Sequence, residues 1–279
     1  MKFFDRLSNG WQLAKTSLAI IEEEKSLLLF PVLSTLALIM VCATFFGGGY
    51  FIFCDQLLAA SETAETGSAV SPFAYVLAFL YYFVTYFVII FFNSALVHCA
   101  VQVLNGEETS LSEGLEFATS KLDKILAWTS IAATVGLVLK VLQSNEKIGQ
   151  IAAAIIGAGW SILTFFVVPV MLYEDKDVFG SIKRSGGIMR EKWGESLGAN
   201  FGFGFINFIA ILLIGVLAFV LAQINIVLAI VVALGSLLLL GTVMSAAQTV
   251  FLAAIYQHVH NRPTGNFDET VLDDAFMTK

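Results

Sequence analysis

Six long apolar stretches dominate the pattern of hydrophobic and polar positions along the chain. About 20 apolar residues are needed to cross the hydrocarbon core of a bilayer as a helix, because each helical residue rises about 1.5 Å. Inside lipid, every backbone N–H and C=O must find its partner within the helix. We therefore predict six membrane spans, at Leu27–Cys54, Phe73–Leu104, Ile125–Leu142, Ile148–Tyr173, Leu197–Leu221 and Ile226–Tyr256. The third is the weakest, because Lys140 shortens its apolar run.

A shorter amphipathic pattern precedes the first, third and fifth spans, with apolar residues at steps of three and four positions. This pattern is typical of a helix that lies at the membrane surface. Leu7–Ala14 aligns without a gap with Leu111–Ala118, and Ser181 and Ser185 are the matching small residues of the third copy. The alternative is a solvated connector with accidental periodicity. We predict one all-α integral membrane domain of three repeated units, about 1–104, 108–173 and 177–258, followed by an acidic tail at 259–279.

Composition and charge agree with a membrane protein. Hydrophobic residues make up 58% of the chain and charged residues only 13%, against about a quarter in soluble proteins. Of the 15 Lys and Arg residues, only Lys140 and Lys147 lie on one side of the predicted topology. The positive-inside rule then predicts that both termini are cytoplasmic. The net charge of −7 gives no support for nucleic-acid binding.

Ionisable residues are nearly absent from the middle of the spans, whereas ion-coupled transporters and proton relays place them there. The most polar face lies on the second span. Neutral polar side chains commonly join helices in membranes, so we expect His98 to bond Gln248 or Ser245 on the sixth span. The alternative is a proton-handling or ligand-binding role for His98. The residues of this intramembrane polar face are Asn93, Ser94, His98, Gln102 and Gln248.

Glycine and proline predict where the spans pack closely or bend. The four-residue spacing of Gly194, Gly198 and Gly202 indicates close approach to a partner helix. We expect the run of glycines at 47–49 to loosen or kink the first span, and Pro169 to kink the fourth.

Four basic residues flank the amphipathic segment ahead of the fifth span, and each such residue near anionic lipid contributes about 1 kcal/mol. We treat them as candidates for contact with lipid headgroups, with a pure topology signal as the alternative. They are Lys183, Arg184, Arg190 and Lys192.

Sequence motifs for catalysis, nucleotide binding or metal binding are absent: there is no GxSxG, Walker or HExxH pattern. His258 and His260 are two positions apart, whereas metal ligands on a helix prefer three or four. We predict a non-enzymatic protein without metal or cofactor. An interfacial enzyme that uses His98 or Glu174 is a third, weaker hypothesis.

Several short segments carry a resemblance to known families. They are Gly10-Trp11 with Ala14 and Ser17, Phe30-Pro31-Val32-Leu33-Ser34, Asn93-Ser94-Ala95-Leu96, Leu104-Asn105-Gly106, and Pro169 with Glu174 ahead of Ser181-Ile182-Lys183-Arg184-Ser185 and Trp193-Gly194. On these residues the chain resembles a prokaryotic multi-pass membrane family of unknown function. More distantly, it is similar to the membrane domain found beside glycerophosphoryl diester phosphodiesterases. The resemblance implies a six-span protein of the cytoplasmic (inner) membrane and brings no catalytic residues.

These observations favour a structural or organising role at the cytoplasmic leaflet, where the protein would bind membrane lipids, a membrane-protein partner or a second copy of itself. The alternative is a pore or carrier for a neutral or lipophilic solute. Its path would be lined by Asn93, Ser94, Asn207 and Gln248.

Overall fold

The chain is an all-α, multi-pass membrane protein. The computed structural model describes residues 3–48, 72–143, 147–174, 176–192, 199–269 and 272. Six helical segments are long and apolar enough to cross a membrane, at Lys25–Gly47, Val76–Leu104, Leu122–Gln143, Gly149–Tyr173, Phe203–Ala222 and Ile226–Val259. They confirm the six predicted spans, including the third, which continues past Lys140 to Gln143.

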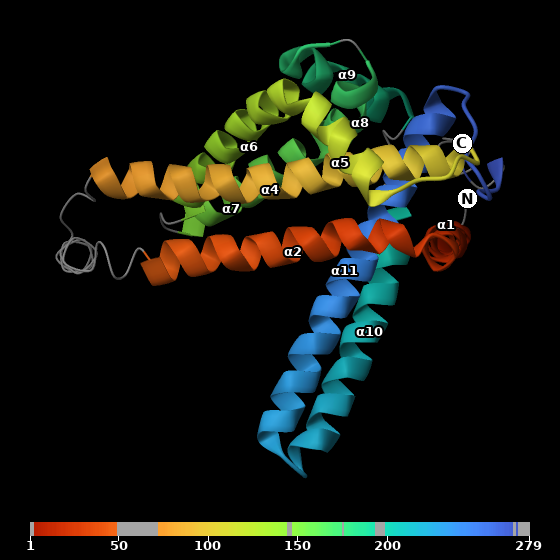
Figure 1. Cartoon of the computed structure of the whole chain (residues 1–279). Helices are drawn as coiled ribbons and strands as arrows, with labels where there is room; N and C mark the ends of the chain where they lie inside the picture. Colours follow the sequence, from red (N-terminus) through yellow and green to blue (C-terminus); the bar gives the residue numbers. More distant parts are fainter. Residues whose placement is uncertain are drawn as a thin grey trace.

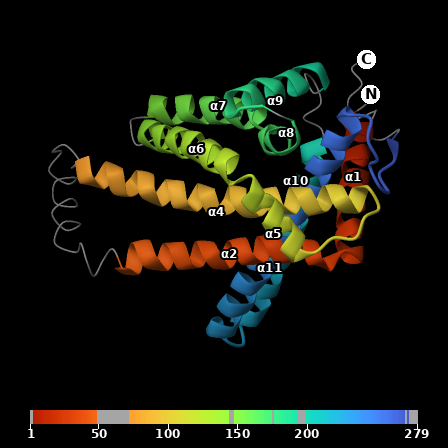
Figure 2. The same ribbon diagram turned by 45° about the horizontal axis from the view of Figure 1, so that its top comes forward.

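The helices form two diverging groups (Figures 1 and 2). In chain order they are α1 (Phe3–Glu23), η1 (Lys25–Leu28), α2 (Leu29–Cys42), η2 (Ala43–Gly48), α4 (Pro72–Leu104), α5 (Leu111–Ser120), α6 (Leu122–Gln143), α7 (Lys147–Leu163), α8 (Val167–Tyr173), α9 (Val178–Lys192), α10 (Ala199–Ala222) and α11 (Ile226–Val259). α2 and α4 run side by side, and the α10/α11 hairpin projects away from them at a steep angle. The groups meet where α11 contacts α4 and α2, and α1 packs on α10 and α11 beside this contact.

The buried core is concentrated where α4 and α11 meet. Buried residues of α4 occur from Ile90 onward, and those of α11 are concentrated from Thr242 onward. We call residues 90–104 of α4, residues 242–257 of α11 and the helix α1 the junction. The outer halves of the spans expose large apolar side chains such as Leu212 and Leu239, as expected of surfaces that contact lipid.

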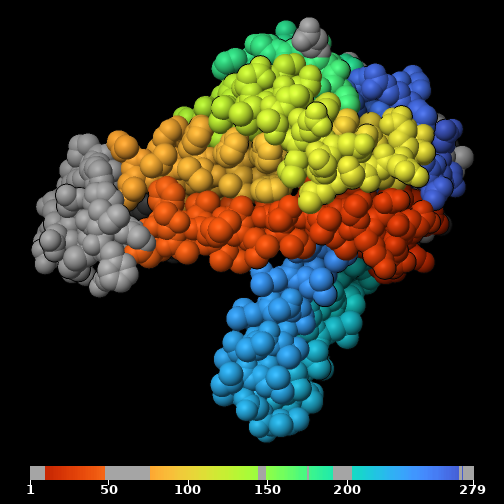
Figure 3. Space-filling model, viewed as in Figure 1, coloured from red at the N-terminus to blue at the C-terminus, as the bar shows by residue number. Residues whose placement is uncertain are grey.

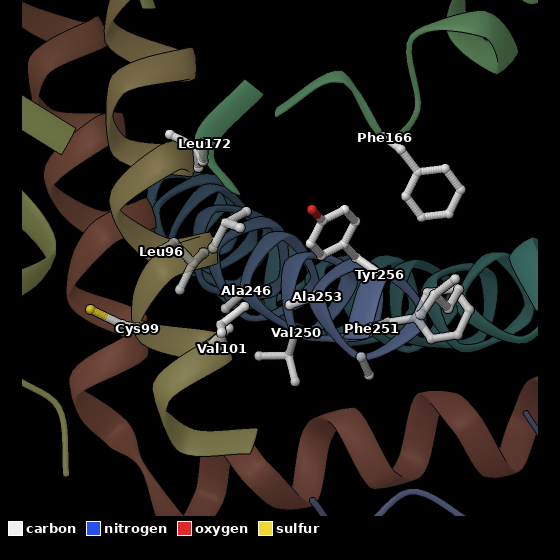
Figure 4. Close-up of a cluster of buried hydrophobic side chains, with 14 of the residues drawn as sticks. Leu96, Cys99, Val101, Phe166, Leu172, Ala246, Val250, Phe251, Ala253 and Tyr256 are labelled. Atoms are coloured by element: carbon white, nitrogen blue, oxygen red, sulfur yellow. The ribbon is translucent and has the colours of Figure 1, made fainter. Parts of the chain in front are cut away.

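Small side chains allow the helices to approach closely at the junction. Ala95 and Ala100 of α4 are fully buried, as are Ala246 and Ala253 of α11. Figure 4 shows the two helices crossing here, with Leu96, Val250 and Tyr256 around the contact. Close packing of this kind stabilises helix pairs in membranes, where lipid competes with any apolar contact.

The helices ahead of the first, third and fifth spans, α1, α5 and α9, bury their small residues. At Gly114 an added Cβ would lie 2.6 Å from both Cys99 Sγ and Phe30 Cζ, so only glycine fits without a shift of these side chains. The threefold repeat itself stays a prediction. The matching buried pairs are Gly10 and Ala14, Gly114 and Ala118, and Ser181 and Ser185.

Two spans depart from regular helix. A π-helix, η2, follows α2 and contains Gly47 and Gly48, which confirms the predicted loosening; Gly49 and the rest of this span to Cys54 lie outside the described residues. The fourth span breaks at residues 164–166, ahead of Pro169, where the kink was predicted. The proline ring clashes with the carbonyl four residues earlier, that of Phe165, so the helix is interrupted before the proline and restarts as α8.

The glycine stripe of the fifth span cannot be placed as a whole. Gly194, Leu197 and Gly198 lie outside the described residues, and the described part of α10 begins at Ala199. Gly202 lies in the first turn of α10, a helix that packs on α1 and α11. Its role in close packing therefore stays a prediction.

We expect Ser185→Ala to destabilise the protein by about 1 kcal/mol. Ser185 is fully buried, and its hydroxyl accepts a hydrogen bond from the Phe166 backbone N–H (2.9 Å) at the break between α7 and α8. Removing the acceptor leaves that N–H without this bond. Thermal unfolding in detergent would measure the loss.

Ser181→Ala is the matched control, because Ser181 is equally buried and lies one turn away on α9. Its hydroxyl donates only to the Asp177 carbonyl of its own helix, which also accepts from the Ser181 backbone N–H. Equal losses in the two variants would contradict the assignment to the Phe166 bond.

Candidate functional site

A cavity of about 650 Å³ lies beside the junction, lined mainly by α2, α4, α10 and α11. Its lining residues all belong to candidate membrane spans. It lies where α2 and α11 diverge, and Figure 3 shows α11 projecting away from the body of the molecule beneath α2. The volume falls within the range of about 300–1,000 Å³ that is usual for small-molecule sites.

The described residues that line the cavity include no acid and no base. The apolar part of the lining is Pro31, Leu38, Ile89, Phe92, Leu96, Phe165, Phe203, Gly204, Leu237, Leu238, Gly241, Phe251 and Leu252. The polar part is neutral: Ser34, Thr35, Asn93, Asn207, Thr242, Ser245, Gln248 and Thr249. The site therefore has many hydrogen-bonding groups but no charge with which to bind an ion.

Several of these polar groups are already occupied. The hydroxyl of Thr242 donates to the Leu238 carbonyl of its own helix at 2.9 Å. Thr249 Oγ1 lies 3.0 Å from Asn93 Oδ1, a contact that joins α11 to α4. The side-chain amides of Asn207 and Gln248, by contrast, have no hydrogen-bond partner among the residues that the structure describes. These two amides can therefore bind a ligand.

The structure brings together three of the four residues that were predicted to line a path: Asn93, Asn207 and Gln248. Ser94 is not one of the lining residues, because it lies on the neighbouring side of α4 and is fully buried; its Oγ has no partner. The sequence signal for the α11 side of the cavity was the spacing of Thr242, Ser245 and Thr249, which places three hydroxyls on one helix face.

His98 makes an interhelical hydrogen bond, as predicted, but its partner is not Gln248 or Ser245 on the sixth span. His98 Nδ1 lies 3.0 Å from the Tyr173 hydroxyl of α8, and the ring stacks on Phe117 of α5 with centroids 3.8 Å apart. His98 is one turn beyond Ser94, on a side of α4 that faces α5 and α8. Gln102, another turn on, accepts a hydrogen bond from the Thr109 hydroxyl at 2.9 Å.

A charged cluster centred on Glu174 joins the end of α8 to α9 and α11. Arg184 Nε and His260 Nε2 each lie 3.3 Å from Glu174 Oε1, and Lys176 Nζ lies 3.3 Å from Oε2. The Glu174 side chain is only 16% exposed, so solvent screens these ion pairs less than at the surface.

His260 faces an acceptor with each ring nitrogen. Nδ1 lies 2.8 Å from the Tyr256 carbonyl oxygen, which can only accept, so Nδ1 carries a proton. Nε2 can donate to Glu174 only if it is protonated as well. The His260 ring is thus held between the Tyr256 carbonyl and the Glu174 carboxylate.

Arg184, one of the lipid-headgroup candidates, is paired with Glu174 through Nε, but its side chain is 35% exposed and its headgroup role stays a prediction. Lys183 and Arg190 are exposed on the same helix and stay candidates, and the side chain of Lys192 lies outside the described residues. Sequence reasoning named Glu174 only as a possible catalytic base. Its three partners, Lys176, Arg184 and His260, are separated from it by 2, 10 and 86 positions in the sequence. No local sequence pattern indicates the pairing with His260.

The fold is that of a helical multi-pass membrane protein, with a cavity between its spans whose described lining is uncharged. Residues 72–266 match the Family of unknown function (DUF6159), and the chain belongs to this family. The match agrees with the resemblance to a family of unknown function, but the comparisons give no support for the likeness to the glycerophosphoryl diester phosphodiesterase membrane domain. No curated protein matches the chain, and no solved structure matches it.

We expect Glu174→Gln to destabilise the protein by about 2 kcal/mol. The change removes the negative charge shared by three basic side chains and leaves them close together without compensation. Unfolding in detergent measures the loss, with the exposed Glu116→Gln on α5 as the control, for which we expect less than about 0.5 kcal/mol. Similar losses in both variants would show that the cluster contributes nothing specific.

Proposed function

We propose that this protein is a non-enzymatic membrane protein that binds a lipophilic molecule in the cavity between α2, α4, α10 and α11. The observation that carries the proposal is the cavity itself, about 650 Å³ in volume and lined by uncharged residues of candidate spans. A pore or carrier for a neutral or lipophilic solute was the alternative function predicted from the sequence. The present proposal keeps this kind of solute but includes only its binding, not its transport.

Access from the bilayer supports a lipophilic ligand. The cavity lies where two helix groups diverge, and α10 exposes large apolar side chains along its length. A molecule dissolved in the hydrocarbon core could reach such a site laterally, without passing through water. An ion would instead need charged or carbonyl ligands, which the described lining side chains do not supply.

The proposed topology puts α1, α5, α9 and both termini on the cytoplasmic side of a prokaryotic inner membrane. The excess of Lys and Arg in the segments on that side supports it. The buried small residues of α1, α5 and α9 support their interpretation as three copies of one amphipathic helix. In this topology the cavity lies toward the cytoplasmic half of the membrane, because the junction is at that end.

An organising role at the membrane surface is the second candidate function. It is favoured by Lys183 and Arg190, which are exposed on α9. Such side chains can hold anionic lipid headgroups, and a partner protein or a second copy could use the same surface.

We expect Gly241→Leu to abolish binding of a lipophilic ligand while leaving the fold intact. Gly241 lines the cavity, and a Cβ added there meets nothing within 4 Å, so the leucine side chain would fill open space instead of clashing. The measurement is lipid mass spectrometry of protein extracted in native lipid particles, and we expect at least a tenfold loss of the enriched species.

Gly235→Leu is the matched control on the same helix. A Cβ at Gly235 also meets nothing within 4 Å, but this residue is exposed and does not line the cavity. If no species is enriched with the natural protein, or if both variants retain the same species equally, the cavity is not the binding site.

The second function predicts that Lys183→Gln combined with Arg190→Gln weakens retention of anionic lipid by about 2 kcal/mol in total, because each charge contributes about 1 kcal/mol. Retained anionic lipid after graded detergent washing is the readout. Lys140→Gln is the control, because it removes an exposed charge from the last turn of α6, a different helix. We expect it to have no effect on the retention of anionic lipid. An equal effect of Lys140→Gln would point to non-specific charge.

A further inference from the structure

Polarity changes along the length of the cavity. On α11 the outer lining residues are Leu237 and Leu238, whereas Ser245, Gln248 and Thr249 lie toward the junction. From residue 237 to residue 249, the helix rises by about 18 Å at 1.5 Å per residue. α2 has the same order, with Leu38 outside and Ser34 toward the junction. The cavity is thus apolar at its outer end. Its polar groups lie further in, and the apolar Pro31, Phe203 and Phe251 close the cavity on the junction side. We call the polar part the inner end.

The inner end offers unpaired amides. Asn207 of α10 and Gln248 of α11 make no hydrogen bond to any described residue, although both line the cavity. An amide provides both an N–H donor and a carbonyl acceptor, and a hydroxyl group can pair with both. In an apolar surrounding, polar groups without partners raise the free energy, so a ligand that pairs with these amides is stabilised.

The inner end also disfavours charge. The described lining contains no Lys, Arg or His to compensate a carboxylate or a phosphate, and no Asp or Glu to compensate an ammonium group. The nearby cations Arg184 and Lys176 are paired with Glu174 and do not line the cavity. Burying an ion without a partner costs far more than burying a hydroxyl that is hydrogen-bonded.

We infer that the ligand is an amphiphile with an uncharged, hydroxyl-bearing head, such as a long-chain alcohol or an acylglycerol, and that the cavity discriminates against ionised lipids. The head lies at the junction end beside Asn207 and Gln248, and the hydrocarbon chain extends toward Leu237 and Leu38 and into the bilayer. This inference rests on the proposed binding function and specifies the chemical class of its ligand.

Photo-crosslinking with three probes tests the inference. The probes carry the same diazirine-tagged alkyl chain and end in a hydroxyl, a carboxylate or an ammonium group. They are incorporated at equal density into lipid particles that contain the full-length protein. We expect the alcohol to label peptides of α10 and α11 at least about tenfold more than either ionised probe. Excess untagged alcohol should compete with this labelling.

Two substitutions test the role of the amides. We expect Asn207→Leu and Gln248→Leu each to reduce alcohol labelling by about two- to tenfold, as for the loss of one hydrogen bond. Both changes place an apolar residue in a membrane span, which is compatible with insertion. Gln150→Leu, at an exposed position of α7 outside the cavity, is the matched control and should label like the natural protein.

The outcomes separate the two proposals. If the ionised probes label the protein as strongly as the alcohol does, and Gly241→Leu still blocks the labelling, the ligand class is overturned but the binding function stays in place. Unchanged alcohol labelling in both amide variants would also overturn the ligand class. If Gly241→Leu does not reduce the labelling by any of the probes, both the ligand class and the binding function are overturned.

Discussion

The close crossing of α4 and α11 at small side chains is the contact on which the rest of the structure depends. Lipid is as apolar as the helices, so two helices stay together in a membrane only where their surfaces fit closely or hydrogen-bond. Ala95 and Ala100 of α4 and Ala246 and Ala253 of α11 are fully buried in this region, and the Thr249 hydroxyl donates to Asn93. The spans diverge outward from this point, so the crossing determines where the cavity forms between them.

The same crossing explains why the cavity is polar at one end. Helix–helix hydrogen bonds require neutral polar side chains near the contact, and α11 supplies Thr242, Ser245 and Thr249 on one face. Where the helices touch, these groups find partners, as Thr249 does with Asn93. Gln248 is the neighbouring residue on α11 but faces away from this contact, is exposed and has no partner among the described residues. Under the proposed function, the same kind of side chain thus joins helices on one face of α11 and binds the ligand on another.

Sequence reasoning predicted the spans well because their signal is local and strong. Twenty apolar residues identify a span without knowledge of its neighbours, and even the run shortened by Lys140 proved to be a full helix. Pairings between helices were less predictable. The partner of His98 is Tyr173, and the partners of Glu174 include His260, which is 86 positions away; neither choice follows from spacing on one helix. Asn93, Asn207 and Gln248 were grouped correctly because few polar residues occur within the spans.

The short helix α8 lies between the charged cluster and the wall of the cavity. Phe165, just ahead of α8, lines the cavity, and the next residue, Phe166, donates its backbone N–H to Ser185 on α9. The other end of α8 is followed by Glu174, which binds Arg184 of α9 and His260 at the end of α11. The helix is interrupted before Pro169, so α8 is not positioned by a continuous helix with α7, and these contacts attach it at both ends instead. The basic side chains at this end of α8 pair with Glu174, and the described lining of the cavity contains no charge.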